Sequence, residues 1–224
     1  MTAATVGVDS RADRLRITEI FNSLQGESRS VGWPTVFIRL TGCPLRCTYC
    51  DTEYAFSGGE WMSLKNILSQ VTRYATQRVC VTGGEPLAQK KCLSLLSQLV
   101  DAGFKVSLET SGALDMRDVD SRVVKVMDIK TPGSGESARN HLDNINYLTA
   151  QDQVKFVLSD RIDYDWAREL LQDLQLEKKC EVLFSPVYSQ LEPKQLAEWI
   201  LEDKLQVRFQ LQLHKVLWGG QSGR

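Results

Sequence analysis

Short runs of apolar and β-branched residues recur along the chain and predict a sheet of short strands. Residues 14–21 alternate between apolar and polar, as in a strand that is buried on one face. A similar alternation at 207–213 predicts a last strand. Buried core strands are predicted at residues 35–40, 78–82, 104–108, 123–127, 153–158 and 181–184.

Between these strands, apolar residues spaced three and four apart predict amphipathic helices. Ser63 and Pro193 suit the first turns of two helices, and Gly103 suits the end of a third. Residues 22–27, after the first strand, are predicted to form a polar loop. The predicted helices span residues 64–71, 87–102, 141–148, 163–176 and 193–201.

Strands that alternate with helices indicate a parallel sheet in an α/β fold. Polar and glycine-rich motifs follow several strand ends, which is the face where ligands bind in such folds. The core strands are too few for a closed eight-stranded barrel. The sequence therefore predicts a partial, open β/α barrel of about six parallel core strands.

Composition favours one domain with a substantial core. The chain has 224 residues, 42% hydrophobic residues and a formal net charge of −1, which argues against a basic nucleic-acid surface. No apolar run approaches the length that crosses a membrane. Residues 1–14 are predicted to be a disordered leader without signal-peptide features, and residues 15–224 a single domain. Free buried thiols, which suit a reducing cytoplasm, are expected at Cys80, Cys92 and Cys180.

Three further cysteines, Cys43, Cys47 and Cys50, follow a core strand with C-x3-C-x2-C spacing. Thiolates this close together bind soft metals, chiefly zinc, copper(I) and iron–sulfur clusters. A structural zinc site has four protein ligands, and ordinary 4Fe–4S carriers use four cysteines. No fourth Cys or His lies near these three in the sequence. One iron of a cluster would therefore stay open for chemistry. From the cysteine spacing alone, a fragment of a zinc ribbon or a set of three redox-active thiols is an alternative interpretation.

Two adjacent glycines, Gly83 and Gly84, follow the strand at 78–82 and precede Glu85 and Pro86. Glycines let a backbone approach a ligand closely. A plain strand-to-helix turn would explain the same residues.

The cysteine spacing, with Tyr49 just before the third cysteine, and the Gly-Gly-Glu-Pro tetrapeptide resemble the radical S-adenosylmethionine (SAM) superfamily. This resemblance implies a 4Fe–4S cluster held by the three cysteines, with SAM on the open iron. Cleavage of SAM would give a 5′-deoxyadenosyl radical that the protein positions and shields. Glu109 is equally suited to capping a strand end. The implied SAM contacts are Tyr49, Asp51, Gly83, Gly84, Glu85, Glu109, Ser111, Asp128, Lys130 and Ser185.

Within that superfamily, the tetrapeptide 24–27, Arg39, the pair Asp51-Thr52 and the closing segment 212–215 resemble the 7-carboxy-7-deazaguanine synthase (QueE) family. The resemblance runs from about Ile17 to Lys215. It implies ring contraction of 6-carboxy-5,6,7,8-tetrahydropterin to 7-carboxy-7-deazaguanine with loss of ammonia, in queuosine biosynthesis. The implied substrate contacts are Leu24, Gln25, Gly26, Glu27, Arg39 and Thr82.

These residue types suit a pterin, because Glu27 can accept from its N–H groups, Gln25 can donate and accept, and Arg39 offers a planar fork of donors. An ion pair within the sheet is the alternative for Arg39. The resemblance also makes Asp51 and Thr52 catalytic candidates, with Thr52 and the substrate carboxylate as ligands of Mg²⁺. For Thr52 alone, a turn cap is the alternative.

The expected partners are the pterin, an external electron donor such as flavodoxin or ferredoxin, and a second copy of the chain in a homodimer. A glycyl-radical activating enzyme and a non-catalytic iron–sulfur protein are alternative functions. The polar loop at 24–27 and the pair Asp51-Thr52 favour a small polar substrate over a protein substrate. His214 is expected to be structural, and Ser185 stands where some relatives have glutamine. Residues 216–224 extend past the point where some relatives end.

Overall fold

The computed structural model describes residues 13–219, 221 and 223, and most of the predicted leader lies outside these residues. Within them, nine strands form one sheet in the order β3-β1-β2-β4-β5-β6-β7-β8-β9. The run from β2 to β9 is parallel, whereas β1 and β3 pair antiparallel at one edge. The strands are β1 (Arg14–Leu24), β2 (Pro34–Leu40), β3 (Glu60–Ser63), β4 (Arg78–Gly83), β5 (Lys105–Thr110), β6 (Val124–Ile129), β7 (Gln153–Leu158), β8 (Glu181–Pro186) and β9 (Arg208–Phe209).

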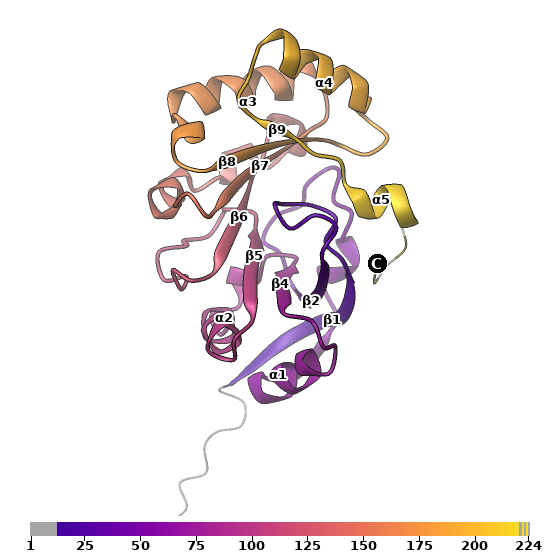
Figure 1. Cartoon of the computed structure of the whole chain (residues 1–224), viewed down its shortest axis with the longest axis vertical. Helices are drawn as coiled ribbons and strands as arrows, with labels where there is room; N and C mark the ends of the chain where they lie inside the picture. The colour runs from indigo at the N-terminus through magenta and orange to yellow at the C-terminus, as the bar shows by residue number, and fades with distance from the viewer. Residues whose placement is uncertain (1–12, 220, 222, 224) are drawn as a thin grey trace, which may run out of the picture.

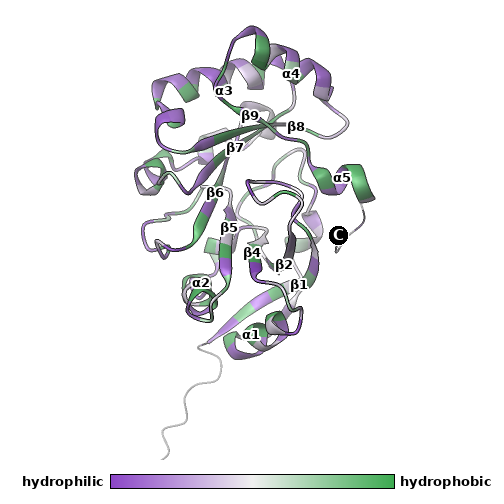
Figure 2. Ribbon diagram, viewed as in Figure 1, coloured by the Kyte–Doolittle hydropathy of each residue, from purple (hydrophilic) through white to green (hydrophobic). Residues whose placement is uncertain are grey.

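Four helices lie along the outer side of the curved sheet, while a fifth, α5, lies near its open side (Figure 1). Helices α3 and α4 carry both hydrophilic and hydrophobic residues, as expected of helices with one face on a sheet (Figure 2). The end strands β3 and β9 are not paired with each other in the described chain, so the predicted open α/β barrel is confirmed. The helices are α1 (Leu64–Thr72), α2 (Cys92–Asp101), α3 (Arg161–Asp173), α4 (Pro193–Glu202) and α5 (Leu213–Trp218).

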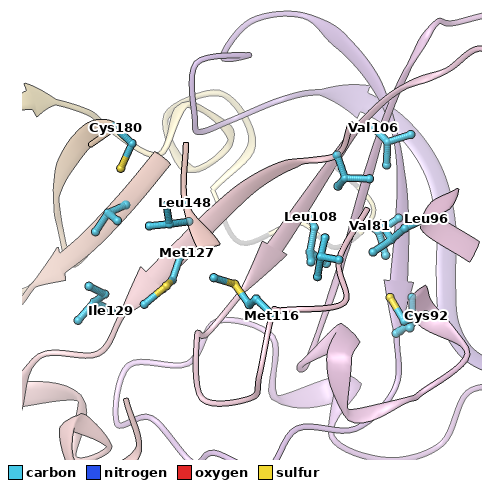
Figure 3. Packing of buried hydrophobic residues seen from close by; sticks show 14 of the residues in the cluster. Val81, Cys92, Leu96, Val106, Leu108, Met116, Met127, Ile129, Leu148 and Cys180 are labelled. Atoms are coloured by element: carbon cyan, nitrogen blue, oxygen red, sulfur yellow. The ribbon is translucent and has the colours of Figure 1, made fainter. Parts of the chain in front are cut away.

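One apolar cluster fills the space between the sheet and helices α1 to α4. Leu96 of α2 lies in this cluster with Val81 of β4 and Leu108 of β5, and all three are fully buried (Figure 3). Burial of one such side chain contributes roughly 1.5–3 kcal/mol. Cys92 and Cys180 belong to the same cluster. The prediction of free buried thiols is confirmed at these positions and at Cys80.

Two predicted helices differ from the structure because side chains make tertiary hydrogen bonds there. The predicted helix at 87–102 becomes α-helical only at Cys92, since Gln89 is extended and its side chain bonds the backbone of Arg16 and of the cysteine loop. The predicted helix at 141–148 is a 3₁₀ helix, Leu142–Tyr147. There, the Asn144 side chain donates to two carbonyls of the turn after β5.

The predicted strand at 207–213 is wrong beyond Phe209, because β9 has only two residues and α5 begins at Leu213. The alternation arises because Gln210 and Gln212 each direct a polar side chain to the loop after β1. Part of the predicted loop at 22–27 is also wrong, since β1 continues to Leu24. Strand β3 and helix α5 were not predicted.

The loop at 25–33, between β1 and β2, reaches across to the opposite end of the sheet. The backbone N–H of Ser28 donates to Gln210 Oε1 at 2.7 Å, and Gln210 Nε2 donates to the Ser28 carbonyl at 2.9 Å. The N–H of Arg29 donates to Gln153 Oε1 of β7 at 3.0 Å. Ser28 has a φ of 64°, a left-handed conformation that is costly outside glycine. These bonds therefore hold a strained loop over the part of the barrel that the sheet leaves open.

We predict that Gln210→Ala lowers the free energy of unfolding by about 2–4 kcal/mol, because it leaves the buried N–H and C=O of Ser28 without partners. Chemical denaturation of the apo-protein measures this change. Gln206→Ala is the control, since the Gln206 side chain makes an exposed bond to the Lys204 carbonyl and should change stability by less than about 0.5 kcal/mol. Equal stability of the two variants would contradict the role of Gln210.

Candidate active site

A cleft of about 440 Å³ opens at the carboxyl ends of the parallel strands, under the loop at 25–33 and α5. All the site residues predicted from the sequence line this cleft except Glu85 and Ser185, whose side chains are fully buried. The motifs that were separate in the sequence thus meet around one space, at the face where α/β folds bind ligands.

The three cysteines of the C-x3-C-x2-C motif are free, half-buried and exposed to the cleft. Burial raises the pKa of Cys47 to about 11 and also raises those of Cys43 and Cys50. Metal binding would therefore release protons from these thiols. In the described part of the chain, no three His, Cys, Asp or Glu side chains converge on a point that could hold a single ion. Three half-buried thiols that face one cleft are a donor set that fits a 4Fe–4S cluster with one open iron.

The Gly-Gly-Glu-Pro turn packs directly under the cysteine loop. A Cβ atom on Gly84 would collide with the Gly42 carbonyl and with Cys43, so only glycine allows this approach. The N–H of Glu85 donates to the Gly42 carbonyl at 2.8 Å, and this bond joins the two motifs. Gly83 has a φ of 150°, which other residues rarely adopt.

The Glu85 carboxylate acts inside the protein and does not face the cleft. Its oxygens accept hydrogen bonds from Leu87 N, from the Thr110 hydroxyl, and from both the N–H and the hydroxyl of Ser111. Four donors around a fully buried carboxylate fix the ends of β4 and β5 to each other. Its predicted role in SAM binding is therefore to orient Ser111 and the glycine backbone.

Asp128, Lys130 and Lys155 form a buried group of charges at the ends of β6 and β7. Lys130 Nζ and Lys155 Nζ lie 3.1 and 3.4 Å from Asp128 Oδ2. Burial by itself raises the pKa of Asp128, but the two ammonium groups outweigh it and lower the pKa below its usual range. Asp128 Oδ1 is buried without a hydrogen-bond partner in the described residues. A ligand hydroxyl is one group that could satisfy it.

Tyr49 packs next to these charges and reaches the adjacent strand. Its hydroxyl donates to the Val157 carbonyl of β7 at 3.2 Å, and burial raises its pKa to about 12. The phenol is therefore neutral at physiological pH and presents a flat apolar face to the cleft. Ser185, on β8, is buried and its hydroxyl has no partner among the described groups. Its direct contact with SAM stays a prediction.

On the neighbouring strands β4 and β5, Thr82 and Glu109 form one network with Gln25 of the loop. Gln25 Nε2 donates to Glu109 Oε1 and the Thr82 hydroxyl donates to Glu109 Oε2, both at 3.0 Å. Gln25 Oε1 accepts from the backbone N–H of Glu27. Glu109 was predicted as a SAM contact, yet the structure groups it with the predicted substrate residues.

Arg39 forms the ion pair considered from the sequence and also lines the cleft, while its contact with the substrate stays a prediction. Its Nε lies 2.7 Å from Glu19 Oε1, on the neighbouring strand β1. The Tyr54 hydroxyl donates to the same oxygen at 2.8 Å. The ion pair therefore holds the Arg39 side chain in place at the cleft wall.

Asp51 and Thr52 face the C-terminal segment across the mouth of the cleft. The Thr52 hydroxyl donates to Asp51 Oδ1 at 2.7 Å, and it makes no capping bond in the following turn as the structure describes it. Lys215 Nζ and His214 Nε2 lie 3.3 and 4.0 Å from Asp51 Oδ2. Burial raises the pKa of Asp51, but the bond from Thr52 and the charge of Lys215 outweigh it and lower the pKa. Two oxygens, one of them anionic, are thus adjacent.

Several polar residues of the cleft were not predicted as site residues. They include Thr110, Lys155, Gln190, Gln212, His214 and Lys215. The sequence did contain a signal for Lys155, because a charged residue interrupts the predicted buried strand at 153–158. His214 was expected to be structural, but its ring lies against Gly26, where a Cβ atom would collide with it.

Comparison with known proteins agrees with this geometry. A family model described as the Radical SAM superfamily matches residues 37–128, which include both cofactor motifs. A 7-carboxy-7-deazaguanine synthase of Koribacter versatilis is 44% identical over 219 residues, which cover 91% of this chain and 97% of that protein. The same enzyme of Chlorobaculum tepidum is also 44% identical, over 91% of this chain and 94% of its own. The chain belongs to the 7-carboxy-7-deazaguanine synthase family.

The crystal structure of QueE from Escherichia coli has the same fold, with a TM-score of 0.75 over 95% of this chain and all of that one, at 24% identity. Family membership makes the chain a radical SAM enzyme that depends on a 4Fe–4S cluster and SAM. The resemblance stated from the motifs is confirmed, and a zinc ribbon or a simple electron carrier is not supported.

We predict that Cys43→Ala, Cys47→Ala or Cys50→Ala prevents assembly of a cluster of about four irons per chain and abolishes SAM cleavage. Iron analysis after anaerobic reconstitution measures the first effect. The control is Cys180→Ala, because this buried thiol lies outside the cleft and its loss should leave the iron content unchanged. Stoichiometric zinc in the wild type, with no iron uptake, would contradict the assignment.

Proposed function

We propose that this protein is a 7-carboxy-7-deazaguanine synthase that converts 6-carboxy-5,6,7,8-tetrahydropterin into 7-carboxy-7-deazaguanine and ammonia. Loss of ammonia accounts for every atom, so the reaction needs no net oxidant. The observation that carries the proposal is the shared cleft. Gln25, Glu27 and Arg39, which suit a polar heterocycle, line the same space as the cysteine loop and the glycine turn.

Cys43, Cys47 and Cys50 would hold the cluster, and the methionyl end of SAM would lie against the backbone of Gly83 and Gly84, which lines the cleft beside them. When bound, these cofactors supply a carbon-centred radical that abstracts hydrogen. The walls that Gln25, Glu27 and residues of α5 add to the cleft would limit the access of water to this radical. Lys130 would offer its ammonium to the SAM carboxylate, and Tyr49 a flat face to its adenine.

The pterin would lie between the loop at 25–33 and the cluster. Its amino group and ring N–H are donors, and the Glu27 and Glu109 carboxylates are acceptors on that side of the cleft. The Gln25 side chain donates to Glu109 Oε1 and accepts from the backbone N–H of Glu27, so it joins the Glu109 carboxylate to the loop that carries Glu27. The N–H donors of the substrate would therefore bind to acceptors that are already held in position, which reduces the entropy lost on binding.

The pair Asp51-Thr52 would contribute oxygen ligands to Mg²⁺, with the substrate carboxylate and water supplying the others. Magnesium prefers oxygen and commonly keeps several waters. The hydroxyl of Thr52 bonds Asp51 and not the turn, so it is free to reorient toward an ion. His214 and Lys215 close this side of the cleft.

A radical SAM enzyme needs a reductant, and we infer that a flavodoxin or ferredoxin supplies the electron. We also infer that residues 15–224 form a single domain, that two copies form a homodimer and that the enzyme acts in the cytoplasm. No helix in the described part of the chain is long and apolar enough to cross a membrane.

Anaerobic reconstitution, followed by mass spectrometry of products from 6-carboxytetrahydropterin, SAM and a reductant, tests the proposed function. The expected result is 7-carboxy-7-deazaguanine in many-fold excess over enzyme, with SAM recovered. Cleavage of SAM to 5′-deoxyadenosine without any change in the pterin would contradict it and favour another radical enzyme, such as one that activates a protein.

For Arg39→Lys, we predict an increase of about tenfold in the KM for the pterin, which corresponds to about 1.4 kcal/mol. The charge is kept, but the planar fork and the Nε bond to Glu19 are lost. SAM binding should change by less than about twofold. Arg78→Lys is a matched control, because Arg78 is also on a core strand but outside the cleft. Equal loss of pterin and SAM affinity in Arg39→Lys would show that Arg39 is structural.

Thr52→Ala should lower turnover about tenfold or raise the Mg²⁺ concentration required, because one oxygen ligand is lost from a weakly held ion. Iron content should stay unchanged. Thr52→Ser keeps the hydroxyl and should keep most of the activity. Steady-state rates at varied Mg²⁺, with substrate present, measure these effects. Wild-type rates and an unchanged Mg²⁺ response in Thr52→Ala would mean that Thr52 holds no metal.

A further inference from the structure

Lys155 is a buried lysine in the middle of the sheet, and the sequence assigns it no role. It stands on β7, where every residue is buried, and its side chain is 10% exposed. Burial lowers the pKa of a lysine, but the charges of Glu27 and Asp128 outweigh this and raise the pKa of Lys155 well above its ordinary value. Removing a charged group from water costs free energy, so a buried lysine that stays charged is a candidate for a functional role.

The ammonium group of Lys155 joins the two halves of the cleft. It lies 2.6 Å from Glu27 Oε2, on the loop proposed to read the pterin, and 3.4 Å from Asp128 Oδ2, at the proposed SAM side. Glu27 lies in the loop after β1, whereas Asp128 is on β6 and pairs directly with Lys155 of β7, so the ammonium joins a residue of the loop to a residue of the sheet. Glu109 is a third carboxylate near enough to raise the Lys155 pKa.

The hydrogen-bond partners of Glu27 and Asp128 indicate how binding of a ligand at one carboxylate would affect binding at the other. Gln212 holds the other oxygen of Glu27 at 2.9 Å, while Asp128 Oδ1 has no hydrogen-bond partner in the described residues. Lys130 shares Asp128 Oδ2 with Lys155 at 3.1 Å. A ligand that donates to Glu27 weakens its attraction for Lys155 and lets the ammonium move toward Asp128. Lys130 is then freer to bind an anionic group in the cleft.

We propose that Lys155 is a positioning residue that couples pterin binding at Glu27 to SAM binding at Asp128 and Lys130. Each ligand raises the affinity for the other, and the two effects are equal because binding free energies are linked. The proposal rests on the proposed function, since it takes the pterin as the ligand of the loop. Lys155 itself need not touch either ligand.

The test is an anaerobic calorimetric titration of the reconstituted enzyme with SAM, without reductant, with and without saturating 6-carboxytetrahydropterin. In the wild type, the pterin should tighten SAM binding about fivefold or more. In Lys155→Met, which keeps the length of the side chain but removes its charge, the ratio should fall below about twofold. Lys155→Arg restores a charged donor and should recover most of the ratio.

Lys125→Met is the matched control. Lys125 is also a buried lysine paired with a carboxylate, 3.1 Å from Asp152 Oδ2, but it does not line the cleft. Its loss should lower the melting temperature and leave the ratio at the wild-type value. If Lys155→Met does not fold, Lys155→Gln takes its place with the same expected loss.

A wild-type ratio near one, or a ratio in Lys155→Met equal to that of the wild type, would overturn the proposal. Pterin turnover by the wild-type enzyme separates this failure from failure of the proposed function. If the wild type makes 7-carboxy-7-deazaguanine but shows no coupling, only the role of Lys155 is wrong. If it makes no product from the pterin, the function itself is wrong.

Discussion

The attachment of the loop at 25–33 to the far end of the sheet is the constraint on which the cleft depends. An open sheet leaves one side of its interior exposed to water, and no helix covers that side until α5. The side-chain amide of Gln210 pairs with both backbone groups of Ser28, much as a neighbouring strand would. Gln153 adds one further bond, because its Oε1 accepts from the backbone N–H of Arg29. The loop thereby supplies a wall, and its first residues, Gln25 and Glu27, become part of the site.

Charge balance is the second constraint, because the cleft brings many ionised groups out of bulk water. Among its described lining residues, four carboxylates stand opposite four cations, namely Glu27, Asp51, Glu109 and Asp128 against Arg39, Lys130, Lys155 and Lys215. Their pairing offsets the cost of burying each one alone. A balanced set also suits SAM, which carries both signs of charge, and a pterin that combines a carboxylate with N–H donors. Binding then exchanges partners within the cleft and does not bury an unpaired charge.

The sequence could predict the parts of this account that depend on local spacing. Each core strand, the cysteine triplet and the Gly-Gly-Glu-Pro turn occupies a few consecutive residues with a recognisable pattern of residue types. The open barrel followed from the alternation of these strands with helices along the chain. The roles of Lys155 and Gln210 could not be predicted, because their partners lie far away in the sequence. Lys155 meets Glu27 across 128 positions of chain, and Gln210 meets Ser28 across 182. The alternation at 207–213 predicted a strand, because glutamines that face a loop give the same pattern as the polar face of a strand.

A crystal structure of the reconstituted enzyme with SAM and 6-carboxytetrahydropterin tests the central claim most directly. The account predicts that the amino edge of the pterin contacts Glu27 under a loop still bonded to Gln210, with SAM between the glycine turn and the cluster. A pterin bound outside this cleft, or a loop at 25–33 displaced from Gln210 while substrate is bound, would contradict it.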